Sequence, residues 1–242
     1  MNILIPMGGR GRRFEGYDNP KPLIEFGGKT LIEHAVTSLD LQGRYIFITQ
    51  QQHNQQYGLD QQLKSIVPDC EIVEINIDTE GPACSALMAG DIINNDEPLV
   101  IANCDQIMCW DGAVFLHNAQ LYDGTIVTYY ETADKNSYAR LDSRGHVTEI
   151  REKEPISTVS LNGIHYWQKG RYFVDSAEQM IANNERYNGE FYIGPTYNYM
   201  IKQGYTVGIH HIPNEQHNAV GIPRDLTDYI NRVYANESSS TG

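Results

Sequence analysis

A glycine-rich segment with several arginines follows the first apolar run of the chain and has the composition of a phosphate-binding loop. It reads Gly8-Gly9-Arg10-Gly11-Arg12-Arg13-Phe14. Glycine lets the backbone approach an anion closely and point several N–H groups at it, and the arginines add positive charge. Lys21 follows between Pro20 and Pro22, which restrict the backbone that carries its ammonium group. Together these residues are suited to hold a triphosphate.

The spacing of the glycines argues against two other nucleotide-binding loops. Phe14 stands where a dinucleotide-binding fingerprint has its third small residue, and no Gly-Lys-Ser/Thr sequence completes a Walker loop. The alternative without function is a tight surface turn with solvated arginines, because glycine-rich loops are frequent. The loop by itself leaves that alternative open.

Two aspartates are candidate magnesium ligands. Asp105 follows the apolar run Leu99–Asn103, where a buried strand is expected to end, and sites of α/β proteins form at strand ends. Magnesium prefers carboxylate oxygens together with phosphate and water. Asp225 is the second candidate, but it precedes Leu226 at an expected helix start, where an acidic residue also stabilises the helix. Both interpretations of Asp225 stay open.

Taken in order, the motifs of this chain resemble those of the sugar-phosphate nucleotidylyltransferase family. The family signature is a Gly-Gly-x-Gly-Thr/Ser-Arg loop after the first strand and then a Lys-Pro pair, and here the chain reads GGRGRRF and PKPL. The resemblance spans residues 1 to about 230 and continues through Glu80–Ala83, Asn103–Asp105, Glu152–Glu154, Asn162–Ile164 and Gly221–Leu226. It implies a magnesium-dependent enzyme that transfers a nucleoside monophosphate from an NTP to a phosphorylated small metabolite and releases pyrophosphate.

The resemblance also implies a role for individual residues. Four are expected to be catalytic: Arg13 and Lys21 on the triphosphate, Asp105 on the metal and Lys153 on the acceptor phosphate. Asp225 is expected to be the second metal ligand. The residues expected to bind the nucleotide are Gly8, Gly9, Gly11, Arg12, Glu80, Gly81 and Ala83, and those expected to bind the acceptor are Glu152, Lys153, Gly163 and Tyr192.

Two of these assignments carry a qualification that is visible in the sequence. Arg12 stands where the family has Thr or Ser, so a hydroxyl contact to the triphosphate is missing or replaced. The run Arg151–Glu154 has an alternative interpretation as solvated charges at a strand end. Its position in the order of motifs favours a binding role.

The segment Glu190–Asn198 bears on the substrates. It departs from the hexose-phosphate enzymes, which usually carry an Asp near Gly194, and is similar to a Glu-x-Tyr-Ile-x-Pro stretch found in a branch of bacterial capsule and cell-surface pathways. That branch implies CTP as donor, and either a sugar 1-phosphate or a non-sugar phosphate as acceptor. Two rival functions stay open: a nucleotide-sugar-dependent glycosyltransferase, although Asp105 is followed by Gln106 and Ile107 and so starts no Asp-x-Asp motif, and an inactive nucleotide-binding module.

The composition of the chain limits which binding partners and which cellular compartment we expect. The chain has 242 residues and a formal net charge of −13, which argues against a nucleic-acid partner because such a partner requires a basic surface. No run of about 18 apolar residues or N-terminal signal is seen, so we expect a cytoplasmic protein that does not bind membranes. The four cysteines lack disulfide spacing. Both a monomer and a homo-oligomer are compatible with the sequence.

The order of predicted elements indicates an α/β fold: a Rossmann-like, mixed and mostly parallel sheet flanked by helices. Strands are expected at Asn2–Pro6, Tyr45–Thr49, Glu71–Ile75, Leu99–Asn103, Thr125–Tyr130 and Tyr205–Ile212. Helices are expected after the N-cap Thr30 and at Ala83–Ile93, Asp111–Gln120, Phe173–Ile181, Tyr197–Ile201 and Leu226–Val233. An antiparallel hairpin, Tyr138–Leu141 with Val147–Arg151, is the expected elaboration for the acceptor. We expect one domain over residues 1–234 and a disordered tail over 235–242.

Overall fold

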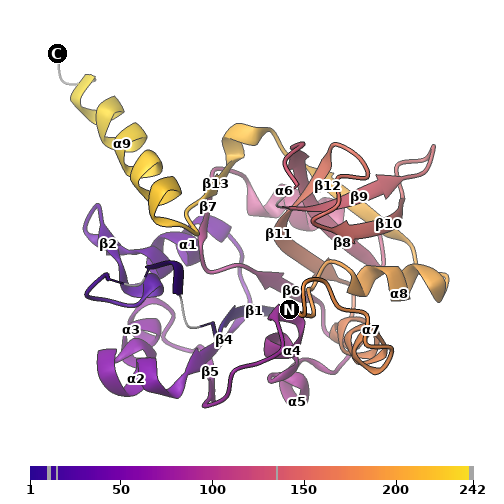
Figure 1. Cartoon of the computed structure of the whole chain (residues 1–242), viewed down its shortest axis with the longest axis horizontal. Helices are drawn as coiled ribbons and strands as arrows, with labels where there is room; N and C mark the ends of the chain where they lie inside the picture. The colour runs from indigo at the N-terminus through magenta and orange to yellow at the C-terminus, as the bar shows by residue number, and fades with distance from the viewer. Residues whose placement is uncertain (10–11, 15, 135, 240–242) are drawn as a thin grey trace.

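A nine-stranded sheet forms the centre of the protein (Figure 1). The computed structural model describes residues 1–9, 12–14, 16–134 and 136–239. The main path of the sheet runs β10-β9-β11-β6-β1-β4-β5, and β8 and β12 continue from β11. The fold is therefore the mixed α/β architecture that the sequence predicts.

The first half of the sheet is parallel. Strand β1 (Asn2–Met7) lies between β4 (Arg44–Gln50) and β6 (Leu99–Ala102), and β4 also pairs with β5 (Glu71–Ile75). Residues 3–5 of β1 are completely buried, as a strand covered on both faces requires. The four predicted strands of this half are confirmed to within about two residues.

The second half is mostly antiparallel. The predicted hairpin is confirmed as β9 (Ser137–Leu141) and β10 (Val147–Glu152), and β12 (Val207–His211) pairs in parallel with β8 (Gly124–Tyr130). Strand β11 (Val159–Trp167) was not predicted, and it pairs with β6 and β8 and so joins the two halves. Its buried polar residues interrupt the apolar pattern that reveals the other strands: Ser160, Asn162 and His165.

Helices cover the sheet. The predicted cap of α1 (Leu31–Leu39) is confirmed, because the Thr30 hydroxyl accepts a hydrogen bond from the Glu33 amide. The single helix predicted over residues 83–93 is wrong: the chain forms α4 (Pro82–Leu87) and α5 (Gly90–Ile93), and Gly90 is a poor residue for continuing a helix. The other helices are α2 (Gln51–Tyr57), α3 (Leu59–Ile66), α6 (Gly112–Ala119), α7 (Gly170–Ala182) and α8 (Thr196–Lys202).

Helix α9 (Pro223–Ser239) projects from the body of the molecule (Figure 1). Its backbone continues past residue 235, where disorder was predicted to begin. No proline or glycine interrupts residues 224–239, so nothing in the sequence ends the helical hydrogen-bond ladder there. Among the described residues, no helix is both long and apolar enough to cross a membrane.

Short elements complete the surroundings of the site. The 3-10 helices η1 (Arg12–Phe14) and η2 (Lys21–Leu23) follow β1, and η3 (Asn214–Gln216) precedes β13. Strand β13 (His217–Ala219) pairs with β7 (Gln106–Met108), which brings the segment before α9 beside the segment after β6. The pair β2 (Glu25–Phe26) and β3 (Lys29–Thr30) leads into α1.

Candidate active site

Two cavities of similar size meet at the carboxyl end of β6. We name the first the loop cavity: it has a volume of about 560 Å³, and its lining includes residues 6–9, Lys21, Asp78, Thr79, Gly81, Pro82 and Ser85. The second, the hairpin cavity, has about 530 Å³ and is lined by the β9–β10 hairpin, β11 and the start of α9. Both are lined by Arg13, Pro82, Asn103, Asp105, Ile193 and Gly221. If each cavity binds one molecule, the two molecules meet and can react at this shared wall.

Lys21 and Asp105 form an ion pair at that wall. Lys21 Nζ donates to Asp105 Oδ2 at 2.7 Å, and the two side chains are 17% and 25% exposed. Burial by itself would lower the pKa of Lys21, but the nearby charges of Cys104 and Asp105 and the hydrogen bond raise it above its ordinary value. Burial also raises the pKa of the Cys104 thiol, so at neutral pH the partner that matters is Asp105. Lys21 is therefore a permanent cation.

The glycine loop lies against β5 and is held by one glutamine. Gln50 Nε2 donates to the carbonyl of Gly8 at 2.6 Å. A Cβ on Gly8 would come within 2.8 Å of Ile75 Cδ1, whereas one on Gly9 would meet nothing within 4 Å. The absence of a side chain at Gly8 therefore allows close packing behind the loop. Gly11 and the side chain of Arg12, both predicted to bind nucleotide, lie outside the described residues.

The segment before α4 closes the loop cavity. Gly81 has a φ of 125°, and a Cβ there would come within 2.6 Å of the Phe191 backbone. Glu80 and Ala83 are not among the residues that line the cavity: Glu80 is exposed and ion-paired with Arg186, and Ala83 is fully buried. Their role in nucleotide binding stays a prediction.

Some lining residues were not among the predicted nucleotide contacts. They include His53, Asp78 and Thr79. Thr79 lies next to the predicted segment, and its hydroxyl is hydrogen-bonded to that of Ser85. No sequence motif identifies His53, because it lies on α2 and only the tertiary fold brings it to the cavity.

Lys153 and Tyr192 are linked at the edge of the hairpin cavity. Lys153 Nζ donates to the Tyr192 hydroxyl at 2.7 Å, and this hydroxyl donates to Glu190 at 2.7 Å. Lys153 has a φ of 54°, an uncommon conformation for a residue with a side chain, and its amide donates to Asn136. Tyr192 lines the cavity, whereas Lys153 is not among its lining residues and reaches it through the contact with Tyr192. A ligand phosphate would therefore compete with Tyr192 for this ammonium group.

Glu152 and Gly163 occupy the interior of the hairpin cavity. Glu152 is buried and accepts a hydrogen bond from Ser137, and burial raises the pKa of its carboxyl above the ordinary value. Gly163 has a φ of 96°, and a Cβ there would lie 2.1 Å from Asn103 Nδ2. Gly163 is thus required by the close approach of β11 to the end of β6. The structure brings both predicted acceptor residues to the same cavity.

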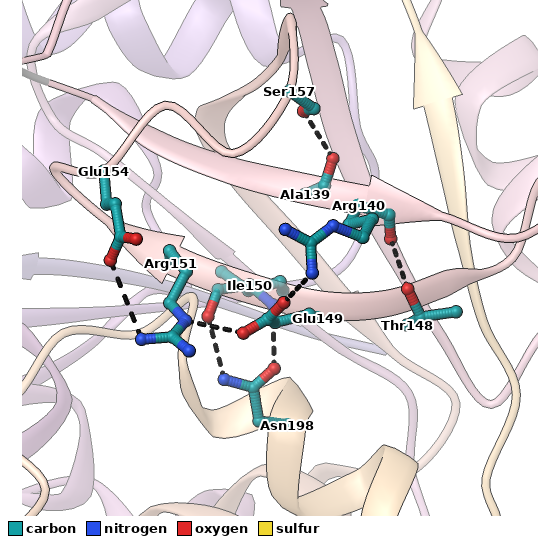
Figure 2. Close-up of polar contacts among 9 residues, drawn as sticks. All are labelled: Ala139, Arg140, Thr148, Glu149, Ile150, Arg151, Glu154, Ser157 and Asn198. Carbon is teal, nitrogen blue, oxygen red and sulfur yellow. Dashed lines mark hydrogen bonds and ion pairs between the residues drawn. The ribbon is translucent and has the colours of Figure 1, made fainter.

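A network of polar contacts fixes the strand that carries Glu152 (Figure 2). Asn198 on α8 accepts from the Ile150 amide at 2.8 Å and donates to the Ile150 carbonyl at 2.9 Å. Glu149 pairs with Arg151 and with Arg140 of β9. Helix α8 thus holds β10 at Ile150, two residues before Glu152. The positions of Glu152 and Lys153 therefore depend on this contact.

Three side-chain nitrogens near the hairpin cavity are buried and have no hydrogen-bond partner among the described residues. They are Gln106 Nε2, His165 Nδ1 and His217 Nδ1. Burial lowers the pKa of His165 to about 3 and that of His217 to about 4, so both imidazoles are neutral at physiological pH. Such unsatisfied groups call for a water molecule or ligand as partner. No sequence motif marks this feature, since it depends on burial.

Two carboxylates fit a magnesium ion: Asp105 at the shared wall and Asp225 in the hairpin cavity. A Cβ on Gly221 would lie 2.7 Å from Asp105 Oδ2, so only glycine leaves that oxygen accessible. Asp225, in the first turn of α9, lines the hairpin cavity and makes no hydrogen bond or ion pair with any described residue. No cluster of three or more potential ligands occurs in the described part of the chain. The pair of aspartates is compatible with magnesium, which takes one or two carboxylates and completes its shell with phosphate and water.

The family follows from a comparison with known domains. A family model, that of the MobA-like NTP transferase domain, matches residues 3–153, more than half of the chain and the part that contains Arg13, Lys21, Asp105 and Lys153. The chain belongs to this family. It is a nucleotidyltransferase, and its family agrees with the resemblance stated from the motifs.

Solved structures agree with this assignment over nearly the whole nucleotidyltransferase. A nucleoside-diphosphate-sugar pyrophosphorylase from Vibrio cholerae RC9 is 25% identical, with a TM-score of 0.84 over 94% of this chain and 99% of the other. A putative glucose-1-phosphate thymidylyltransferase from Bacillus anthracis is 20% identical, with a TM-score of 0.75 over 96% and 94%. The inositol-1-phosphate CTP transferase of T. maritima is 13% identical, with a TM-score of 0.71 over 93% and 90%. No curated protein matches the chain.

Proposed function

We propose that this nucleotidyltransferase transfers a cytidylyl group from CTP to the phosphate of a small hydroxylated metabolite and releases pyrophosphate. It would act in the cytoplasm, where nucleoside triphosphates are supplied, on a route to cell-surface polysaccharide. The observation that carries the proposal is the shared wall: a cavity with the glycine loop and a cavity with Glu152 meet at Arg13 and Asp105.

The loop cavity is proposed to take the NTP. Gly8 and Gly9 present backbone to it, and Arg13 and Lys21 supply its fixed positive charge. In the reaction a phosphate oxygen of the acceptor attacks the α-phosphorus while the bond to the pyrophosphate oxygen breaks. Arg13 and Lys21 then stabilise the charge that develops on the leaving pyrophosphate, because fixed cations at a desolvated site lower the barrier.

The hairpin cavity is proposed to take the acceptor. Tyr192 lines this cavity and contacts Lys153, which would bind the acceptor phosphate, and Glu152 lines it and would accept from an acceptor hydroxyl. With both substrates held on either side of Asp105, the reacting oxygen and the α-phosphorus are brought together, which replaces a bimolecular encounter with a positioned one.

Asp105 and Asp225 would hold magnesium together with phosphate oxygens. The ion supplies neutralisation of charge on the triphosphate. Asp105 at the shared wall and Asp225 in the hairpin cavity are the residues that would hold it, and Gly221 keeps the approach to Asp105 open.

Support for the substrates comes from two directions. The Vibrio cholerae structure is named for a pyrophosphorylase of nucleoside-diphosphate sugars, which fits a phosphorylated, hydroxyl-bearing acceptor. CTP rests on the similarity of Glu190–Asn198 to the cytidylyltransferase branch. The T. maritima structure, named for CTP transfer to inositol 1-phosphate, shares the fold. Family membership favours nucleotidyl transfer over the rival glycosyltransferase and the inactive binding module.

The test is a matrix of the four common NTPs and dTTP against sugar 1-phosphates, polyol phosphates and aminoalcohol phosphates. Pyrophosphate release is measured with and without magnesium. The proposal expects release with CTP and a hydroxylated acceptor only when magnesium is present. Preference for another NTP would overturn the choice of donor, and the absence of release from every combination would overturn the proposed reaction.

A further inference from the structure

The carboxylate proposed for the metal is already bonded to a lysine. Lys21 Nζ lies 2.7 Å from Asp105 Oδ2, and both side chains are mostly shielded from solvent. Water screens such a pair less than a surface pair, so the ammonium group is a strong competitor for this oxygen.

The metal and the ammonium group would share the same oxygen. Lys21 already occupies Asp105 Oδ2, and the rest of the approach to this oxygen is open only because Gly221 has no side chain, since a Cβ there would lie 2.7 Å away. A divalent ion on this carboxylate would stand within a few ångströms of the ammonium group, and the two cations would repel each other.

A phosphate in the loop cavity would give Lys21 another partner. Lys21 itself lines that cavity beside Gly9 and Arg13. Its backbone is held in η2 between two prolines, so the movement available to it is rotation of the flexible side chain. A short swing would move the ammonium group from Asp105 to a phosphate oxygen and release the carboxylate.

We propose that Lys21 and the divalent metal compete for Asp105, and that the triphosphate removes this competition by binding Lys21. Asp105 therefore binds metal tightly only when nucleotide occupies the loop cavity. This inference rests on the metal site of the proposed function. Its consequence is that metal and nucleotide bind cooperatively, because each favours the arrangement that the other requires.

The test measures Mn²⁺ binding to the intact protein without nucleotide, by the loss of the free-ion EPR signal. Lys21→Met removes the ammonium group and keeps a side chain of similar length, so it should raise Mn²⁺ affinity about tenfold, a typical size for coupling between two sites. Arg13→Met is the matched control: it removes a cation that lines the same cavity and makes no hydrogen bond or ion pair with Asp105 among the described residues. Its effect on Mn²⁺ affinity should be much smaller.

Asp105→Asn in the Lys21→Met background identifies the site, because the gained Mn²⁺ binding should disappear. Circular dichroism confirms that each variant is folded. Equal Mn²⁺ affinity in wild type and Lys21→Met, an equal gain in Arg13→Met, or a gain that survives Asp105→Asn would each overturn the inference. Magnesium-dependent pyrophosphate release by the wild type, measured separately, shows whether the proposed function itself fails.

Discussion

Single residues at the shared wall have chemistry that their neighbours cannot replace. Lys21 is mostly buried, charged and bonded to Asp105, whereas Lys29 on β3 is exposed and paired with Glu33. Removing a fixed charge from a desolvated phosphate site has a far greater effect than removing a solvated one. The effects of substitution should therefore differ sharply between these two lysines.

We predict that Lys21→Ala lowers the rate of pyrophosphate release about 100-fold to 1000-fold, the range seen when one stabilising group is removed from a preorganised site. Asp105→Asn should have an effect of the same order. The measurement is steady-state turnover with saturating magnesium, with circular dichroism as a check on folding. Lys29→Ala should retain nearly all activity, and near wild-type turnover of Lys21→Ala would refute the assigned role.

Asp225 offers a prediction that separates its two interpretations. If it binds magnesium, Asp225→Asn should raise the magnesium concentration needed for half-maximal turnover by about tenfold and change stability little. If Asp225 is instead a purely structural acid in the first turn of α9, the same substitution should lower the free energy of unfolding by about 0.3–1 kcal/mol and leave the magnesium dependence unchanged. Titration of activity with magnesium and thermal unfolding distinguish the outcomes.

At the scale of elements, β11 connects the parallel half of the sheet with the antiparallel half. Gly163 on β11 lies against Asn103, directly after the end of β6. The shared wall includes residues of this same segment after β6. The geometry of the two cavities therefore depends on how closely these strands approach. Helix α8 has a comparable role for β10 through Asn198.

Gly163→Ala should lower the free energy of unfolding by about 2–4 kcal/mol, because the new Cβ combines an unfavourable φ with a steric overlap on Asn103. Gly145→Ala is the matched control: Gly145 has a φ of 84°, but a Cβ there would meet nothing within 4 Å, so it should lose only about 1 kcal/mol. Chemical denaturation measures both. Equal losses would show that the contact with Asn103 is unimportant.

Asn198→Ala should loosen β10 and raise the KM for the acceptor several-fold while the KM for the NTP changes little. The variant loses two hydrogen bonds to the Ile150 backbone, which together contribute about 1–3 kcal/mol. Arg140→Gln, which removes an exposed ion pair from the same hairpin, serves as control and should leave both KM values unchanged. A rise in the KM for the NTP alone would contradict the assignment of the hairpin cavity to the acceptor.

At the scale of the whole molecule, the proposed phosphate site is a local group of cations on a chain whose net charge is −13. Its stability should also depend on pH through two buried histidines. The pKa of His165 is lowered to about 3 and that of His217 to about 4, so the unfolded chain takes up protons near pH 6.5 whereas the folded protein does not. The stability that these residues contribute is present above pH 6.5 and is lost as the pH falls toward 4 and 3.

Between pH 7 and pH 5, each of these histidines should therefore lower the free energy of unfolding by about 1–2 kcal/mol. His165→Gln should make the curve of stability against pH shallower over this interval, because Gln does not titrate. Denaturant unfolding at several pH values measures the slope. An unchanged slope would show that His165 is protonated in the folded protein.

Local patterns along the chain were sufficient to specify the parallel half of the fold and to predict which types of residue bind phosphate. Apolar runs such as Asn2–Pro6 specify buried strands, because burial on both faces requires them, and the segment from Gly8 to Lys21 specifies a loop with cations. The order of motifs then specified the family, which the match over residues 3–153 confirmed.

Which of these residues share a wall was settled by the three-dimensional arrangement alone. Lys21 and Asp105 are 84 positions apart, and their contact depends on β6 lying beside β1. Strand β11, the break between α4 and α5 and the unpaired nitrogens of Gln106 and His165 were not predicted. These features share one physical reason. Burial and strand pairing depend on residues that are distant in the chain, and a local sequence pattern contains no information about those residues.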